Sequence, residues 1–414
     1  MEKDLTSKVN LSKLFVVVAV AAACGALEAN EAPASGWRFR YLAPAEWSTE
    51  GWRKASLPLG NGWFGASEFG GVHVERLQLT EPSFQTRQLL YDRRDWPEGN
   101  LTDAADVAIV LERRVWPALH GMADFLTRCV AETNGLWLST FSASPEQIHT
   151  RKMRKTHGVY CHTVGCAFDQ QMIEANNAAL VRYAKMLGRD DDPVVKRCKT
   201  QLGKYDGVIV GESGQIKEFR EERKYGEIGD PRHRHISHLC GLFPCAIMNR
   251  ATPEWFKAAS RTLDLRGDKT HAWAIAHRAC CRARLGEGDK ALAAFDVLFS
   301  NRLTDTLCAL IGKTQEVDAD LGYTAAVTEM LLQSHETDAQ GNFIIDLLPA
   351  LPKKWTSHGS FRGLCARGGW MVDCEWRDGR PLAVALRPGP HAAAVPPLVR
   401  FGGKPWQDVI VRKE

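Results

Sequence analysis

The pattern of hydrophobic positions divides the chain into three blocks. In the first, residues 36–94, apolar and polar side chains alternate in short runs such as Val72-His-Val-Glu-Arg-Leu-Gln-Leu79. This alternation is typical of half-buried strands. Asn61-Gly62 stands between two apolar stretches, where it predicts a hairpin turn. The first block is therefore predicted to be β-structure.

The middle block, residues 113–335, has apolar residues at helical spacing. The spacing predicts helices joined by polar loops, with no strand signals between them, over residues 116–132, 171–187, 252–263, 272–285, 290–299 and 322–333. Thr252 before Pro253 is typical of a helix start, and Asp289 is a candidate cap for the next helix. Paired helices stacked around a ring are the expected arrangement.

The last block, residues 340–414, returns to strand patterns. Two apolar runs, Trp370–Trp376 and Leu382–Leu386, flank Asp378-Gly379 and predict a hairpin. The fold class predicted for the whole chain is therefore a multidomain α+β protein. A helical domain lies between two β-rich parts.

Residues 1–29 have the pattern of an export signal. Lys8 and Lys13 precede the apolar run Leu14–Ala23, which is too short to span a bilayer comfortably. We expect a signal peptide ending at Ala29, a secreted or periplasmic protein, and no membrane span. Two alternatives remain open: a lipid anchor at Cys24, and an N-terminal helix that is buried.

Composition and charge narrow the classes of function. Hydrophobic content of 44% and a net charge of +4 over 414 residues describe an ordinary globular protein. The one dense basic run, Arg151–Lys155, lacks aromatic neighbours, which favours a solvated loop over a nucleic-acid site. The 12 cysteines are scattered without a Cys-x-x-Cys pair, so most are interpreted as small buried apolar residues.

Candidate chemistry gathers between residues 214 and 239. Gly214-Gln-Ile-Lys-Glu-Phe219 contains Glu218, and Asp230-Pro-Arg-His-Arg-His-Ile-Ser-His-Leu239 follows with three histidines, His233, His235 and His238. Such clustering of titratable groups is typical of an active site. Taken alone, Glu218 also fits a solvated run of charges, and the histidines fit structural positions. A zinc site with Cys240 is disfavoured, because histidines two residues apart are uncommon as paired helical ligands.

These two segments resemble glycoside hydrolase family 95, the inverting α-L-fucosidases. In that family Gly-Gln-Leu-Gln-Glu-Trp runs into Asp-Pro-x-His-Arg-His-x-Ser-His-Leu. Further matches are Leu57–Gly62, Glu75–Glu81, Val317–Gly322 and Gly363–Gly369. The resemblance implies a partial (α/α)6 helical toroid at 113–335. An N-terminal β-sandwich fragment at 36–94 and a small C-terminal β-domain at 340–414 flank the toroid. It also implies a fucosylated glycan as partner, and no metal or organic cofactor.

The resemblance also assigns roles to single residues. Glu218 matches the general acid, which needs a pKa raised by partial burial. Asp318 matches the carboxylate on the base side, and a helix cap formed by Asp318 or Asp320 is the alternative. Substrate binding falls to His233, His235, His238, Trp273 and Glu146, although Trp273 also fits a core position.

One family motif has no counterpart here. The water-holding asparagines of the family lie in Asn-x-Asn-x-Gln-Met-Asn-Tyr-Trp, and the chain passes almost directly from first-domain strands to a late barrel helix between Thr86 and Arg114. The chain is therefore interpreted as internally truncated. The leading hypothesis is hydrolysis of terminal α-linked L-fucose or L-galactose with inversion. The alternatives are a catalytically inactive homologue that at most binds sugar, and a chain whose uncovered apolar faces prevent stable folding.

Overall fold

The computed structural model describes residues 57–60, 65–68, 77–80, 115–150, 152–304, 307–312, 314–389, 392–393 and 395–412. Three short strands lie in the first block: β1 (Leu57–Gly60), β2 (Gly65–Glu68) and β3 (Leu77–Thr80). They pair antiparallel in the order β1-β2-β3. The turn predicted at Asn61-Gly62 and the predicted signal segment 1–29 lie outside the described residues.

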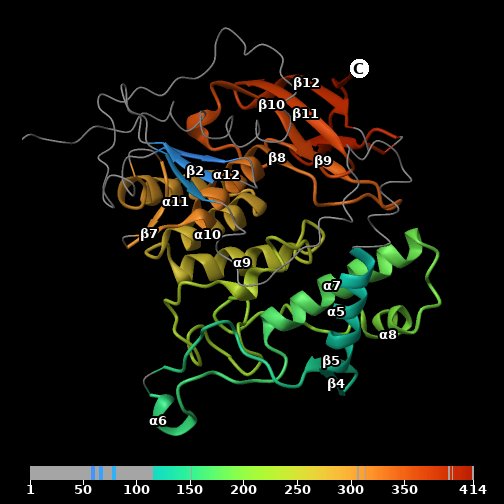
Figure 1. Ribbon diagram of the computed structural model, residues 1–414, viewed down its shortest axis with the longest axis vertical. Helices are drawn as coiled ribbons and strands as arrows, with labels where there is room; N and C mark the ends of the chain where they lie inside the picture. Colours follow the sequence, from blue (N-terminus) through green and yellow to red (C-terminus); the bar gives the residue numbers. More distant parts are fainter. Residues whose placement is uncertain are drawn as a thin grey trace, which may run out of the picture.

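The middle block is mainly helical, as predicted. Its helices are α5 (Trp116–Arg128), α6 (Arg154–His157), α7 (Ala167–Met186), α8 (Pro193–Gln201), α9 (Pro253–Arg266), α10 (Ala272–Arg284), α11 (Gly288–Asn301) and α12 (Val317–Leu331), with the 3-10 turn η4 (Ser237–Leu239). Helices α5, α7 and α8 pack around one apolar core and α10, α11 and α12 around another, and these two groups stand apart in Figure 1.

The prediction that no strand interrupts the helices was wrong. Helix α5 ends at Arg128, and β4 (Val130–Thr133) pairs antiparallel with β5 (Leu136–Ser139). Asn134 and Gly135 between them have φ values of 54° and 82°, the left-handed conformation that a tight hairpin turn requires. A second small hairpin joins β6 (Leu310–Ile311) to β7 (Thr314–Gln315).

One predicted helix start is confirmed, and two predicted caps were wrong. Thr252 is the N-cap residue of α9 and Pro253 opens the helix, although the Thr252 hydroxyl donates to the Asn249 carbonyl at 2.9 Å and makes no cap bond. Asp289 lies inside α11 and accepts the Lys353 backbone N–H at 2.8 Å. Asp318 and Asp320 lie in the first turn of α12, where Asp320 accepts the Ala309 N–H at 2.7 Å. The two aspartates that do bond, Asp289 and Asp320, tie their helices to neighbouring segments.

One carboxylate does cap a helix. The Asp192 side chain accepts the N–H groups of Val194 and Val195 at the start of α8. We expect Asp192→Ala to lower the free energy of unfolding by about 1 kcal/mol. Urea denaturation measures this, with Asp191→Ala as the control, because the Asp191 side chain is fully exposed. Equal losses in the two variants would contradict the capping role.

The last block forms two sheets. The first has the order β10-β11-β12-β15 and the second β14-β13-β9-β8. The strands are β8 (Leu332–Gln333), β9 (Ile344–Leu347), β10 (His358–Ala366), β11 (Trp370–Arg377), β12 (Arg380–Pro388), β13 (Leu398–Phe401), β14 (Lys404–Pro405) and β15 (Ile410–Val411), with the 3-10 turn η5 (Lys353–Trp355). The predicted hairpin is confirmed, and its turn residues Asp378 and Gly379 have φ values of 50° and 72°.

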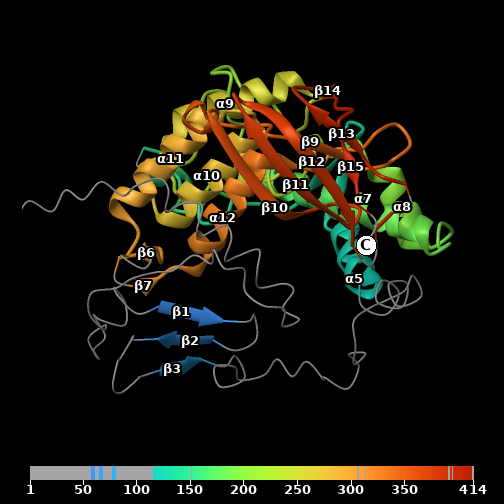
Figure 2. The ribbon, with the colours of Figure 1, turned by 90° about the horizontal axis from the view of Figure 1, so that it is seen from above.

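The C-terminal strands and the last helices share one apolar core. Figure 2 shows β10, β11 and β12 crossing over α10 and α12. Phe295 of α11, Met330 of α12 and Trp376 of β11 belong to the same cluster of buried side chains. The indole N–H of Trp376 donates to the Trp355 carbonyl at 2.7 Å, so its one polar atom is satisfied.

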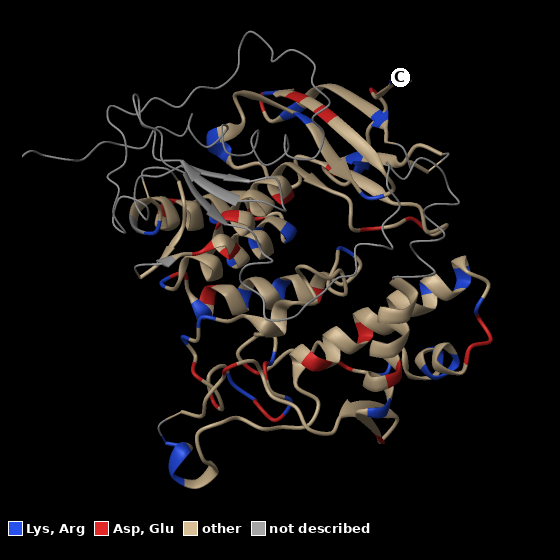
Figure 3. Cartoon of the chain, in the orientation of Figure 1, with Lys and Arg blue, Asp and Glu red and all other residues tan. Residues whose placement is uncertain are grey.

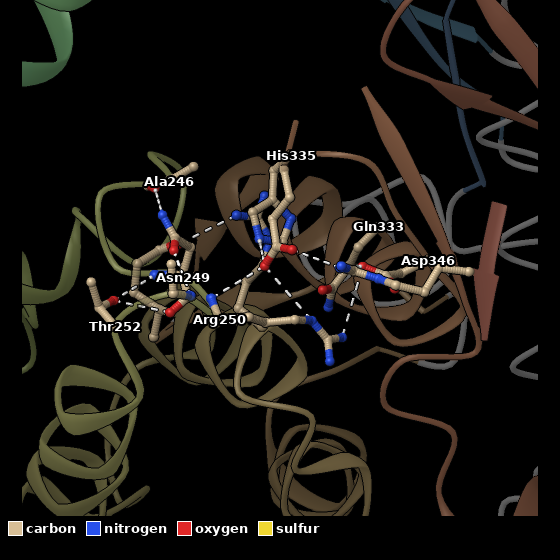
Figure 4. A network of polar contacts seen from close by, with 12 residues as sticks. Ala246, Asn249, Arg250, Thr252, Gln333, His335 and Asp346 are labelled. Atoms are coloured by element: carbon tan, nitrogen blue, oxygen red, sulfur yellow. Dashed lines mark hydrogen bonds and ion pairs between the residues drawn. The ribbon is translucent and has the colours of Figure 1, made fainter. Parts of the chain in front are cut away.

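An ion-pair network joins the same two parts at their edge. Arg400 of β13 binds both carboxylate oxygens of Asp346 at 2.5 Å and Glu336 at 2.6 Å. The backbone N–H of Arg250, just before α9, donates to Glu336 at 3.2 Å. Figure 4 shows Arg250, His335 and Asp346 converging here. Because Glu336 and Asp346 are largely buried, this network fixes the sheet against the helical part.

Within the described residues, basic and acidic positions are interspersed over the helices and sheets in Figure 3. The last two residues of the basic run predicted as a loop, Arg154 and Lys155, begin the short helix α6. Most cysteines within the described residues are buried, as predicted. None of the described helices is long and apolar enough to span a membrane.

Candidate active site

The site is built around Glu218, whose loop is fixed by backbone bonds. The Ile216 N–H donates to the Thr262 hydroxyl of α9 at 2.8 Å, and the Lys217 N–H donates to the Ile209 carbonyl at 2.8 Å. Phe219 fills the interior beneath. The backbone carbonyl of Glu218 accepts the Ala167 N–H at the start of α7. The carboxyl group is thereby held inside the protein, only 5% exposed.

Three side chains from distant parts of the chain donate to this carboxylate. The Ser144 hydroxyl reaches Oε1 at 2.6 Å, while the Gln147 amide and the Arg266 guanidinium reach Oε2 at 2.9 and 2.8 Å. All three are themselves buried. A carboxylate with this many donors is strongly favoured in its charged form.

The charge state of Glu218 differs from the prediction. Burial acts to raise its pKa, but His238, Arg266 and the hydrogen bonds from Ser144 and Arg266 lower it to about 2. The prediction of an acid with a raised pKa was therefore wrong, because the hydrogen-bond donors and nearby cations outweigh desolvation. Nearby Glu222 has the opposite shift, to a pKa of about 6, because it is buried and lies beside Glu218.

His238 faces the same carboxylate. Its Nδ1 lies 3.8 Å from Oε1 of Glu218, too far for a hydrogen bond, and has no hydrogen-bond partner. The ring is almost fully buried, and this burial lowers its pKa to about 4, so the imidazole is neutral at pH 7. An unsatisfied buried nitrogen beside a buried carboxylate marks a place where a ligand hydroxyl can bind.

The other predicted binding residues form a continuous row. His233 stacks on His235 with ring centroids 5.0 Å apart, and His235 contacts Trp273 at 4.9 Å. Glu146 accepts from the His235 ring at 3.3 Å and forms an ion pair with Arg234. The structure therefore brings the predicted histidines, the tryptophan and the glutamate together.

Two buried arginines hold the backbone of the histidine segment. Arg266 donates to the carbonyls of Asp230 and His233, both at 3.3 Å. Arg278 of α10 donates to the carbonyls of Arg234 at 3.0 Å and His233 at 3.4 Å. Arg266 therefore positions Glu218 and the histidine segment at the same time.

Asp318 is placed differently from Glu218. It is exposed at the start of α12, and within the described part of the chain its side chain has no hydrogen bond or ion pair. Its charge helps to raise the pKa of Glu316, after burial, and Glu316 accepts the Trp273 N–H at 3.1 Å. Two residues further on, burial and the neighbouring Glu316 raise the pKa of Asp320 to about 6.

Sequence reasoning missed the residues that hold Glu218. Gln147 directly follows the candidate Glu146, and Arg266 precedes Trp273 by seven residues, but neither side chain was predicted to contact Glu218. No local sequence signal identifies them, because their contacts with Glu218 are long-range. Among the residues that the structure covers, no group of three or more His, Cys, Asp or Glu is arranged to hold a metal ion.

Comparisons with known proteins identify the family of the chain. The model of the glycosyl hydrolase family 95 catalytic domain matches residues 105–331, and that of the family 95 C-terminal domain matches residues 333–394. "Alpha-L-fucosidase 2" of Arabidopsis thaliana is 31% identical over 295 residues, covering 67% of this chain and 33% of the relative. "Probable alpha-fucosidase A" of Aspergillus oryzae (strain ATCC 42149 / RIB 40) is 31% identical over 238 residues, covering 52% and 32%.

The two matched regions are the helical part that holds Glu218 and the β-rich part that follows it, which places the chain in the class of proteins built from a family 95 catalytic domain and its C-terminal domain. The chain belongs to glycosyl hydrolase family 95. It spans about a third of the length of the curated relatives that it matches.

Proposed function

We propose that this protein is an exported glycoside hydrolase that removes terminal α-linked L-fucose, or the similar L-galactose, with inversion. Family membership and the names of two fucosidase relatives support this substrate class. The observation that carries the proposal is Glu218, buried and held by Ser144, Gln147 and Arg266, with the unpartnered Nδ1 of His238 beside it.

Each residue has a defined task in this proposal. Glu218 protonates the leaving oxygen, and Asp318 serves on the base side, where it activates water on the opposite face of the sugar. The His238 nitrogen binds a sugar hydroxyl. His233, His235 and Trp273 contact the sugar, since an indole face suits the apolar face of a sugar ring.

The charge of Glu218 constrains how such a reaction runs. Its pKa of about 2 leaves it ionised at neutral pH, and only the protonated form donates. We therefore place the working range of the enzyme on the acidic side, because the protonated fraction grows as the pH falls.

A second candidate function is sugar binding without turnover. Asp318 is exposed and no amide bonds to it within the described residues, whereas an inverting hydrolase needs a group that positions the attacking water. In this case the sugar contacts of His238 and its neighbours are retained and hydrolysis is absent.

One experiment separates the two functions. The purified protein is incubated at pH 5 with an α-1,2-fucosyl galactoside, and the anomeric proton signals are followed by NMR. Release of β-L-fucose as the first product supports an inverting hydrolase. Release of the α-anomer first contradicts inversion. Line broadening of the fucose signals without release supports binding alone, and unchanged signals from folded protein contradict both functions.

A further inference from the structure

The turn after His238 carries two cysteines, Cys240 and Cys245, that the proposed hydrolysis does not use. The backbone N–H of Cys245 donates to the carbonyl of Cys240 at 3.0 Å. A bond of this length holds the two α-carbons on the order of 6 Å apart, and disulfides span about 4.4–6.8 Å between α-carbons. The backbone is already folded back to the separation that a disulfide needs.

Side chains of two helices hold this turn in place. The Gln171 amide of α7 accepts the Gly241 N–H at 2.8 Å and donates to the His238 carbonyl at 2.9 Å. The Arg284 guanidinium of α10 donates to the carbonyl of Cys245 at 3.2 Å. The two cysteines are therefore kept near each other by contacts that do not depend on their own sulfur atoms.

The thiols are also close to each other and accessible. Burial raises the pKa of Cys240 to about 12, and the neighbouring Cys245 adds to that shift. Both cysteines are partly exposed, whereas Cys280 and Cys281 are buried. Burial raises the pKa of Cys245 as well, but Arg284 and Arg367 oppose that shift. Cys245 is the better nucleophile of the pair, because neighbouring cations favour a thiolate.

We propose that Cys240 and Cys245 form a disulfide when the protein meets a small disulfide such as oxidised glutathione. The Cys245 thiolate attacks one sulfur of the small disulfide, whose S–S bond breaks and releases one thiol. The Cys240 thiolate then attacks the Cys245 sulfur and releases the second thiol. Two electrons pass to the small disulfide, and the two cysteine protons leave with its two thiols. This proposal does not rest on the proposed hydrolase function.

Cys281 is the competing partner for Cys240. The fully buried Cys281 has a pKa raised by burial and, next, by Cys240, so these two sulfur atoms also lie near each other. Trypsin separates the two outcomes. Cleavage after Arg234 and Arg250 leaves Cys240 and Cys245 in one peptide, whereas Cys281 falls in the peptide 279–282.

In the test, the folded full chain is equilibrated with mixtures of reduced and oxidised glutathione and quenched with acid. The protein is then alkylated and digested with trypsin, and the peptide masses are measured by mass spectrometry. We expect peptide 235–250 to become two hydrogen atoms lighter and resistant to alkylation. Because folding holds the two cysteines together, we expect the disulfide to persist in the folded protein at a ratio of reduced to oxidised glutathione at least about tenfold higher than in urea. Complete alkylation throughout, equal ratios in the two states, or a cross-link to peptide 279–282 would each overturn the proposal.

Two variants sharpen the test. Cys281→Ala is expected to form the same bond at the same glutathione ratio, and loss of the bond in this variant would count against the pair. Cys245→Ser is expected to lose it and to leave Cys240 free or bound to glutathione. If Cys245→Ser does not fold, the result for Cys281→Ala still shows whether Cys240 and Cys245 form the disulfide.

Discussion

In the Glu218→Gln variant we expect fucoside hydrolysis to fall by about a thousandfold or more, because a general acid contributes on the order of 10²–10⁴ to the rate. The amide has a similar shape and still accepts a hydrogen bond from Arg266, but it has no proton to give. In the parent protein, kcat/KM is expected to rise as the pH falls from 7 toward 4. The carboxyl group, with a pKa of about 2, is increasingly protonated over that range.

Glu221→Gln is the matched control for this variant. Glu221 lies in the same loop, is exposed, and accepts only the Thr163 hydroxyl, at 2.6 Å. Its replacement should leave the rate within about twofold of the parent. Rates are measured by release of fucose, after circular dichroism has shown that each variant is folded. If Glu218→Gln retained a tenth of the parent rate, the proton donor would have to be another group.

Replacing Arg266 by methionine is expected to lower the free energy of unfolding by about 3–5 kcal/mol at pH 7, because it leaves the buried carboxylate of Glu218 without its cation. The carbonyls of Asp230 and His233 lose the same donor. The loss should therefore exceed that of any exposed ion pair in the described structure.

The pH dependence of this loss has a definite sign. In the parent, the Glu218 pKa is lowered from 4.5 to about 2, so its stabilisation is complete above pH 4.5 and disappears as the pH falls toward 2. The difference between the parent and Arg266→Met should shrink over the same range. Urea unfolding at a series of pH values measures it.

Arg261→Met is the control on the same helix, because Arg261 is exposed and makes only one long contact, at 3.4 Å. We expect a change within about 0.5 kcal/mol and no dependence on pH. A loss in Arg266→Met that stayed constant from pH 7 to pH 3 would show that packing, and not the ion pair, is the cause.

Elements with strong local signals could be predicted from the sequence. Helix α10 and the β11–β12 hairpin were found because apolar periodicity and the Asp378-Gly379 turn agree with the tertiary structure. The β4–β5 hairpin was missed although Asn134-Gly135 carries the same kind of signal, because its flanking residues continue the apolar spacing of α5. The helix caps predicted at Asp289 and Asp320 were wrong because both side chains bond to distant backbone groups, which no local pattern reveals.

In the candidate site, the residues could be predicted from the sequence but the charge state of Glu218 could not. Glu218, the histidines, Trp273 and Glu146 were identified from sequence motifs and gather in space. The state of Glu218 could not be predicted, because Ser144, Gln147 and Arg266 are 74, 71 and 48 residues away along the chain. Burial alone predicts a raised pKa, and only the contacts reveal that it is lowered.

The junction between the two family domains has a consequence for how the molecule behaves as a whole. Helix α12 ends at Leu331 and β8 begins at Leu332, so the two matched domains meet without a linker. Their side chains fill one core, and at its edge the backbone N–H of Arg250 in the first domain donates to Glu336 in the second. We therefore expect no protease-sensitive linker at this junction. A chain that ended at Leu331 would expose the apolar sides of α10 and α12 to water. The domains can be told apart in sequence comparisons, but in the molecule they share one hydrophobic core, and we expect them to unfold together.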